Sequence, residues 1–100
     1  MPRVIAADNV NTPAIVTTAG DVLTAKERRY WMIQNVGTNP VFIKMGTGAS
    51  STVFHFVLKK GTGDSDGLGG SFYQGEGGVV YQGIISMDGT TPKVVVTEIV

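Results

Sequence analysis

The sequence contains no cysteine and only one histidine, His55. The missing cysteines exclude a disulfide framework, a thiol nucleophile and a cysteine-ligated zinc or iron–sulfur site. A single histidine excludes any site that requires two. The chain also lacks an excess of either charge, because 8 basic residues balance 8 acidic ones. Composition therefore favours neither nucleic acid nor an anionic membrane as a partner.

Long hydrophobic runs are missing as well. No apolar stretch approaches the roughly 18–20 residues that cross a bilayer. Residues 1–5 lack the apolar core of a secretory signal, so we expect neither a membrane span nor a signal peptide. With 100 residues and 42% apolar side chains, the chain has the size and composition of one domain with one hydrophobic core.

Helical periodicity is also scarce, whereas residues that favour β-strands are abundant. Val, Ile and Thr together number 32, and the 14 glycines are about twice the usual share. Glycines and prolines interrupt the chain every 8–15 residues. These features predict an all-β fold, a two-sheet antiparallel β-sandwich of jelly-roll or immunoglobulin-like type, with a small β-barrel as the alternative.

The pattern predicts a flexible N-terminal arm over residues 1–12 and a single sandwich domain over residues 13–100. Within the domain, alternation and turn residues predict strands at 14–18, 22–25, 28–35, 41–45, 53–58, 79–87 and 93–100. Residues 61–78 hold eight of the glycines, and we expect a long functional or mobile loop there. We expect 28–35 and 41–45 to pair as a hairpin around 37–40.

The core is expected where large apolar residues share one face of a strand. Strands 28–35 and 93–100 differ, because each carries apolar side chains on both of its faces. In the first, Trp31 and Ile33 alternate with Tyr30 and Met32. Such a strand predicts cover by the core on one side and by a loop or another chain on the other. The residues expected to be largely buried are Ile33, Ile43, Phe54, Phe56, Ile84 and Val96.

Candidate catalytic and metal-binding residues have simpler structural interpretations. We expect His55 to be a half-buried histidine in a sheet. Asp64 and Asp66 have the spacing of a calcium loop, but Leu68 and Gly75 occupy positions 5 and 12, where such a loop needs oxygen ligands, so a solvated turn is favoured. The glycine stretches 61–63 and 75–78 lack the helix that phosphate loops require. No catalytic, cofactor-binding or metal-binding residue is therefore assigned, and we expect a protein that is not an enzyme.

Residues 28–31 mix arginine with aromatic side chains, as platforms for single-stranded nucleic acid do. Tyr30 and Trp31 would point to opposite faces of a strand, and the net charge is zero. A structural role is favoured, with Arg29 paired to an acid and Trp31 in the core or an interface.

Residues 28–44, RRYWMIQNVGTNPVFIK, resemble a run found in small structural proteins of tailed bacteriophages. The resemblance continues to residue 100 through a Phe-His strand ending in Leu-Lys, an Asp- and Gly-rich loop and a Tyr-x-Gly-x-Ile strand. In this sequence these are Phe54-His55 to Leu58-Lys59, residues 61–70, and Tyr81 to Ile85.

This resemblance implies a capsid decoration, or cement, protein that binds the outer capsid surface and stabilises the shell by multivalent contacts. It implies a homotrimer, a major capsid protein as partner, and a virion location after assembly in the host cytoplasm. The alternative is a receptor- or glycan-binding module of a head or tail fibre, with Tyr73 and Tyr81 stacking on sugars. The residues expected to bind the capsid or another subunit are Arg3, Val4, Ile5, Tyr30, Phe72 and Tyr73.

Overall fold

A computed structural model describes residues 6–75 and 77–100. Its only helix is a single 3₁₀ turn, Ala7–Asn9. The remaining regular elements are eight β-strands: β1 Ala14–Val16, β2 Gly20–Leu23, β3 Tyr30–Asn35, β4 Val41–Met45, β5 Phe56–Leu58, β6 Ser71–Gly75, β7 Ile85–Asp88 and β8 Val94–Ile99.

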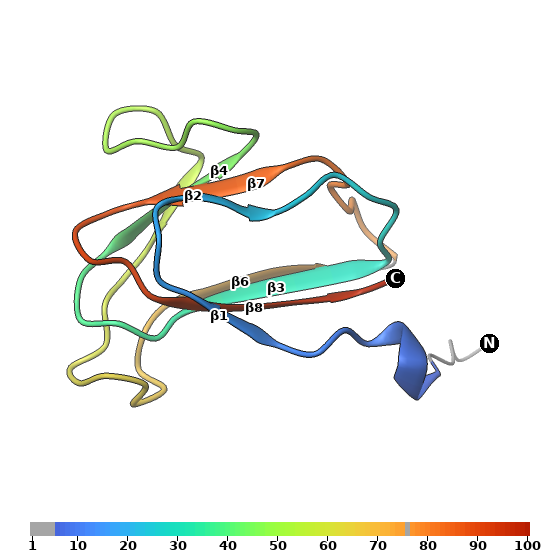
Figure 1. The fold of residues 1–100 in the computed structure, drawn as a ribbon, viewed down its shortest axis with the longest axis horizontal. Helices are drawn as coiled ribbons and strands as arrows, with labels where there is room; N and C mark the ends of the chain where they lie inside the picture. The colour runs from blue at the N-terminus through green and yellow to red at the C-terminus, as the bar shows by residue number, and fades with distance from the viewer. Residues whose placement is uncertain (1–5, 76) are drawn as a thin grey trace.

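The strands form two four-stranded sheets that face each other (Figure 1). Sheet A has the order β1-β8-β3-β6, sheet B has the order β2-β7-β4-β5, and every pairing between named strands is antiparallel. β1 pairs with β8, β2 with β7, β3 with β6 and β4 with β5. This is one long ribbon of four strand pairs rolled into two layers, the jelly-roll topology. The predicted two-sheet sandwich is confirmed.

The core lies between the sheets and is built by alternation along the strands. In β8 every second side chain is buried, and β3 shows the same period. Ile33, predicted to be buried, is opposite Val96 in the sheet, and both are almost fully inaccessible. The buried apolar residues are Trp31, Ile33, Val41, Ile43, Leu58, Ile85, Met87, Val94 and Val96.

The expected hairpin between residues 28–35 and 41–45 is wrong. β3 pairs with β6 and β8 in sheet A, whereas β4 pairs with β5 and β7 in sheet B. The connection through residues 36–40 therefore crosses between the layers. Asn35 stabilises this crossing, because its Nδ2 donates to the carbonyls of Asn39 (2.8 Å) and Leu58 (3.1 Å), and its Oδ1 accepts from the Gly37 amide.

The expected loop over residues 61–78 contains a strand that the pattern did not reveal. β6 follows directly after Gly70 and pairs with β3 over its whole length. The expected strand over 79–87 is also shorter, because only β7 is regular there. Residues 79–84 run without pairing to a named strand, and Arg28 Nη1 donates to the carbonyls of Tyr81 and Gly83.

Three of the expected core residues behave differently. Phe54 is 40% exposed, so its prediction is wrong, while Phe56 and Ile84 are half-buried. Phe54 precedes β5 and packs against Phe42 with the two rings tilted, and Phe42 alternates with the buried Val41 and Ile43 along β4. His55 is also exposed rather than half-buried. It lies outside β5, where its Nδ1 accepts a hydrogen bond from the Met45 amide at 2.9 Å.

The part of the N-terminal arm that the structure describes contacts β8. The Asn11 amide donates to the Glu98 carbonyl, and Asn9 exchanges backbone and side-chain hydrogen bonds with Val100. The expected arm residues Arg3, Val4 and Ile5 lie outside the described residues. A truncation that tests the arm should therefore spare Asn9 and Asn11.

Candidate interaction surfaces

Of the expected contact residues, Tyr30 and Tyr73 lie on the outer side of sheet A. Tyr73 is 66% exposed, and the two rings stack with their centroids 5.8 Å apart. Phe72 alternates with Tyr73 along β6 and points into the sandwich. There it contacts Trp31 and stacks on Phe56 at 4.4 Å. Phe72 therefore packs in the core. Of the three expected aromatic contact residues, Tyr30 and Tyr73 are the two that lie on the outer side of the sheet.

These tyrosines belong to a continuous surface that we name the uncharged face. It is formed by the side chains of sheet A that alternate with the buried ones. Strand register sets its rows: Ile15 is opposite Val95, and Thr97, Met32 and Tyr73 are opposite one another across β8, β3 and β6. The side chains of this face are Ile15, Tyr30, Met32, Gln34, Ser71, Tyr73, Val95, Thr97 and Ile99.

The uncharged face is accessible in the single chain. Ile15 is 56% exposed and Met32 is 36% exposed, and Val10, bridged to Ile99 at the margin, is 44% exposed. Lys93 lies at the end of β8 and is neutralised by Asp64, with Nζ 2.7 Å from Oδ2. The sequence anticipated apolar side chains on both sides of strands 28–35 and 93–100, and this alternation is the signal that locates the face.

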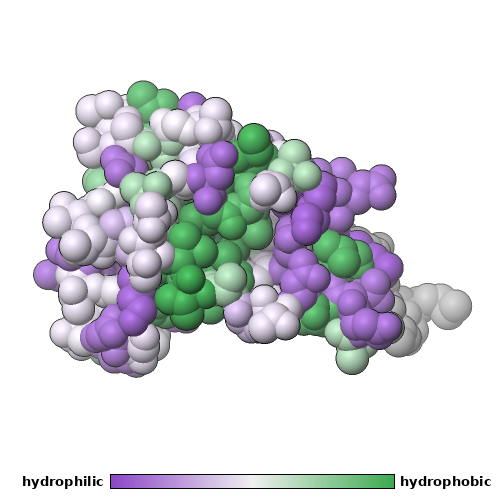
Figure 2. All heavy atoms as spheres, viewed as in Figure 1, coloured by the Kyte–Doolittle hydropathy of each residue, from purple (hydrophilic) through white to green (hydrophobic). Residues whose placement is uncertain are grey.

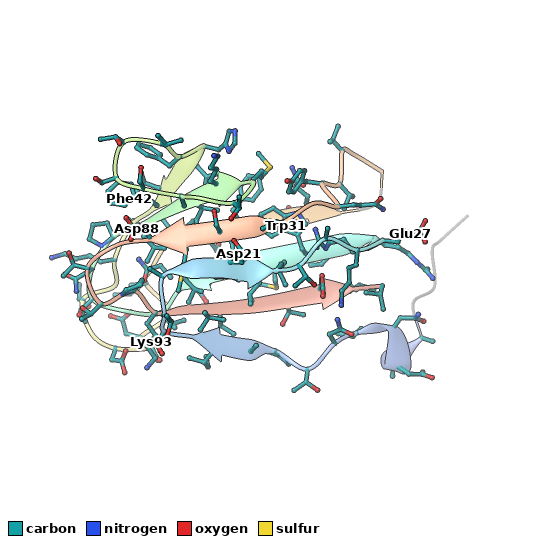
Figure 3. All side chains as sticks on the ribbon, turned by 45° about the horizontal axis from the view of Figure 1, so that its top comes forward. Asp21, Glu27, Trp31, Phe42, Asp88 and Lys93 are labelled. Atoms are coloured by element: carbon teal, nitrogen blue, oxygen red, sulfur yellow. The ribbon has the colours of Figure 1, made fainter. Side chains whose placement is uncertain are left out.

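A second apolar surface lies on the outer side of sheet B, and we name it the aromatic hairpin. It consists of Phe42, Val53, Phe54 and Val57. Phe42 and Val57 are opposite each other on β4 and β5, and Phe54 packs on Phe42 with a centroid distance of 5.1 Å. Figure 3 shows Phe42 and Asp88, which pair across β4 and β7, at the same end of this sheet.

The loop that carries the aromatic hairpin is held by its own hydrogen bonds. Ser50 and Val53 exchange two backbone hydrogen bonds, and Ser50 Oγ accepts from the Val53 amide at 2.9 Å. Ser86, buried on β7, donates to the Gly46 carbonyl and accepts from the Ala49 amide. The hairpin therefore presents its apolar side chains from a defined turn. Sequence reasoning missed it because it assigned Phe54 to the core.

The glycine-rich loop before β6 is ordered by one carboxylate. Asp66 accepts hydrogen bonds from the amides of Thr62, Gly63 and Leu68 and from the Thr62 hydroxyl, at 2.7–2.9 Å. The Leu68 amide contributes most to lowering the pKa of Asp66 to about 2, followed by the Thr62 hydroxyl and the Gly63 amide. Both carboxylate oxygens are engaged by loop donors, which agrees with the predicted solvated turn.

This arrangement predicts a titration of the loop at unusually low pH. Because the pKa of Asp66 falls from 3.8 to about 2, its stabilisation of the loop is complete above pH 3.8 and is lost as pH falls through about 2. In an NMR titration, the carboxyl carbon of Asp66 and the amides of Thr62, Gly63 and Leu68 should share this midpoint. An Asp66→Asn variant should lack the transition. A midpoint near 3.8 in the parent would contradict the proposed hydrogen bonds.

Two shallow hollows complete the described surface. One, of about 270 Å³, lies beside Arg28, Arg29 and Gln82. The other, of about 120 Å³, lies between the edge strands β1 and β2 and includes Val22 and Leu23. Figure 2 shows apolar side chains gathered in a band that crosses this edge of the sandwich from one sheet to the other.

Within residues 6–75 and 77–100, no three acidic or histidine side chains are grouped so that they could hold a metal ion. The same part of the chain holds no helix of the length and apolarity needed to cross a bilayer. The geometry defines a jelly-roll sandwich with an apolar surface on the outside of each sheet. No family model, no curated protein and no solved structure matches the chain.

Proposed function

We propose that this protein is a bacteriophage capsid decoration protein that binds the outer surface of the shell, without enzymatic activity, as a homotrimer. The proposal rests on the resemblance of residues 28–100 to small virion proteins and on one structural observation. That observation is the pair of apolar surfaces, the uncharged face and the aromatic hairpin, on the outer sides of opposite sheets.

Surfaces on opposite sides of a stiff sandwich suit a protein that braces its neighbours. One chain can contact two neighbouring proteins at the same time, one through each surface. The close-packed core between the surfaces resists deformation and so holds the two contacts at a fixed separation. In a trimer, several weak shell contacts are linked and their effects multiply. Jelly rolls occur in viral capsid proteins and also in lectins, so the topology alone does not separate the two candidate functions.

The aromatic hairpin is the surface that we assign to the major capsid protein. It projects Val53 and Phe54 from a hydrogen-bonded turn, so little side-chain and loop entropy is lost on binding. Aromatic residues that enter a partner's apolar pocket commonly dominate the energy of an interface. Phe54, supported from behind by Phe42, has this geometry.

Replacing Phe54 should therefore weaken attachment to capsids. In co-sedimentation with purified undecorated capsids, Phe54→Ser is expected to bind at least about tenfold more weakly than the parent, because it loses an apolar anchor. Val79→Ser is the matched control, since Val79 is 82% exposed in the segment before β7 and belongs to neither surface. A chain lacking residues 2–6 tests the arm separately. Equal binding by the Phe54→Ser variant and the parent would refute the role of the hairpin.

The glycan-binding alternative is tested by the same experiment. Tyr81 is half-buried and packs against the core, and Tyr30 and Tyr73 stack on each other at 26°. Of the two tyrosines that the alternative assigns to sugar stacking, Tyr73 is 66% exposed and Tyr81 is not, so the expected pair does not form one platform. Failure of the parent protein to bind capsids, combined with retention on a glycan array, would overturn the decoration role.

A further inference from the structure

The uncharged face is a continuous surface to which the proposed capsid contact assigns no role. It spans all four strands of sheet A and contains no charged side chain in its rows. Among residues 6–75 and 77–100, nine large apolar residues are exposed, and four of them lie on this face or at its margin: Val10, Ile15, Met32 and Tyr73. Soluble chains rarely leave such a patch open to water.

We propose that the uncharged face is the contact between copies of this chain. This inference deepens the proposed function, because a trimer requires a contact between subunits and the resemblance does not locate it. The face is remote from the aromatic hairpin, which lies on the other sheet. Association through the uncharged face therefore leaves the hairpins free to meet the shell.

The lack of charged side chains on the uncharged face favours a second copy of this chain as its partner. A partner that presented a lysine or a carboxylate to this face would bury that charge without an opposite one, which is strongly unfavourable. A second copy brings an equally uncharged sheet. At the margin, Lys93 is already neutralised by Asp64 of its own chain, so two copies meet without repulsion there.

The shape of the face also suits another copy. In a trimer the contact between subunits is heterologous, so the uncharged face of each copy meets both of its neighbours around the three-fold axis. Four strands about 4.8 Å apart and about 20 Å long give a flat area of roughly 300–400 Å². Stable interfaces bury about 800 Å² of accessible surface on each partner, so association in the micromolar range is expected rather than an obligate assembly.

A charge placed in the middle of the face should separate the copies. Met32→Lys puts an ammonium in the central row between Thr97 and Tyr73, where each copy would have to desolvate it. Sedimentation velocity from about 1 to 200 μM should show association of the parent, with a dissociation constant at least about 100-fold higher for Met32→Lys. The matched control, Val79→Lys, also replaces an exposed apolar residue by lysine, in the segment before β7 and in neither named surface, and should associate like the parent.

Two results would overturn the inference. One is a parent that stays monomeric over the whole concentration range, and the other is a folded Met32→Lys variant that associates like the parent. If circular dichroism shows that Met32→Lys is unfolded, Tyr73→Lys replaces it, because Tyr73 is 66% exposed on edge strand β6. Capsid co-sedimentation of the parent decides the proposed function separately, whichever way the association measurement falls.

Discussion

Replacement of Trp31 by alanine is expected to destabilise the fold by about 3–5 kcal/mol, the usual cost of removing a large aromatic side chain from a core. Trp31 is fully inaccessible and contacts Phe72. Its Nε1 also donates to Gln74 Oε1 at 2.9 Å, and the same oxygen accepts from the Tyr81 amide. The total stability of a small domain is only about 5–15 kcal/mol, so this variant should be close to unfolding at 37 °C.

Chemical denaturation followed by circular dichroism measures this loss. Trp31→Phe keeps most of the apolar volume and removes the hydrogen bond, so it should cost less than the alanine variant, about 1–2 kcal/mol. Tyr73→Ala, on the outer side of the same sheet, is the control and should change the free energy of unfolding by less than about 1 kcal/mol. Similar losses for Trp31→Ala and Tyr73→Ala would contradict the assignment of inner and outer faces.

Replacement of Arg28 by methionine is expected to cost a similar amount, about 3–5 kcal/mol, because it leaves a buried carboxylate without its main partner. Arg28 is 2% exposed and Glu98 is 5% exposed, and Arg28 Nε lies 2.8 Å from Glu98 Oε2. The guanidinium also donates to the carbonyls of Thr24, Tyr81 and Gly83. It therefore joins the chain between β2 and β3 to the irregular segment before β7.

A double-mutant cycle separates the ion pair from the backbone contacts. Arg28→Met combined with Glu98→Leu removes both charges. The double variant should therefore lose less free energy of unfolding than the sum of the losses in the two single variants. The double variant should not recover the full stability of the parent, because three backbone carbonyls still lose the donor that Arg28 provided. Lys26, whose Nζ lies 3.1 Å from Glu98 Oε1 and is largely exposed, provides the control. Lys26→Met should cost no more than about 1 kcal/mol, and strict additivity in the cycle would contradict coupling between Arg28 and Glu98.

The buried ion pair involves the neighbour of the arginine that the sequence singled out. The RRYW run directed attention to Arg29, whereas the arginine that is buried against Glu98 is Arg28. Trp31, expected in the core or an interface, lies in the core, on the same side of β3 as Ile33. Alternation identifies that shared side because it depends only on spacing along one strand. It cannot identify the acid, because Glu98 is 70 residues away and meets Arg28 only after β3 and β8 pair.

The glycine-rich region was misread for a related physical reason. Its glycines suggested mobility, yet a Cβ on Gly69 would overlap the Asn35 carbonyl, and one on Gly75 would lie 2.9 Å from Tyr30 Cδ2. These glycines permit close approach of β6 to β3 and the adjoining chain. Composition alone does not distinguish a glycine that confers freedom from one that allows tight packing.

The sequence by itself determined the all-β class, the punctuation by turns and the two apolar sides of β3 and β8. These properties are local, because β-branching and a period of two act between neighbours in the chain. Only the tertiary structure decided that β3 and β4 belong to different sheets, that Phe72 points inward and that Phe54 points outward. Each of those outcomes depends on which distant strand supplies the hydrogen bonds, and this pairing cannot be inferred from a residue's neighbours in the sequence.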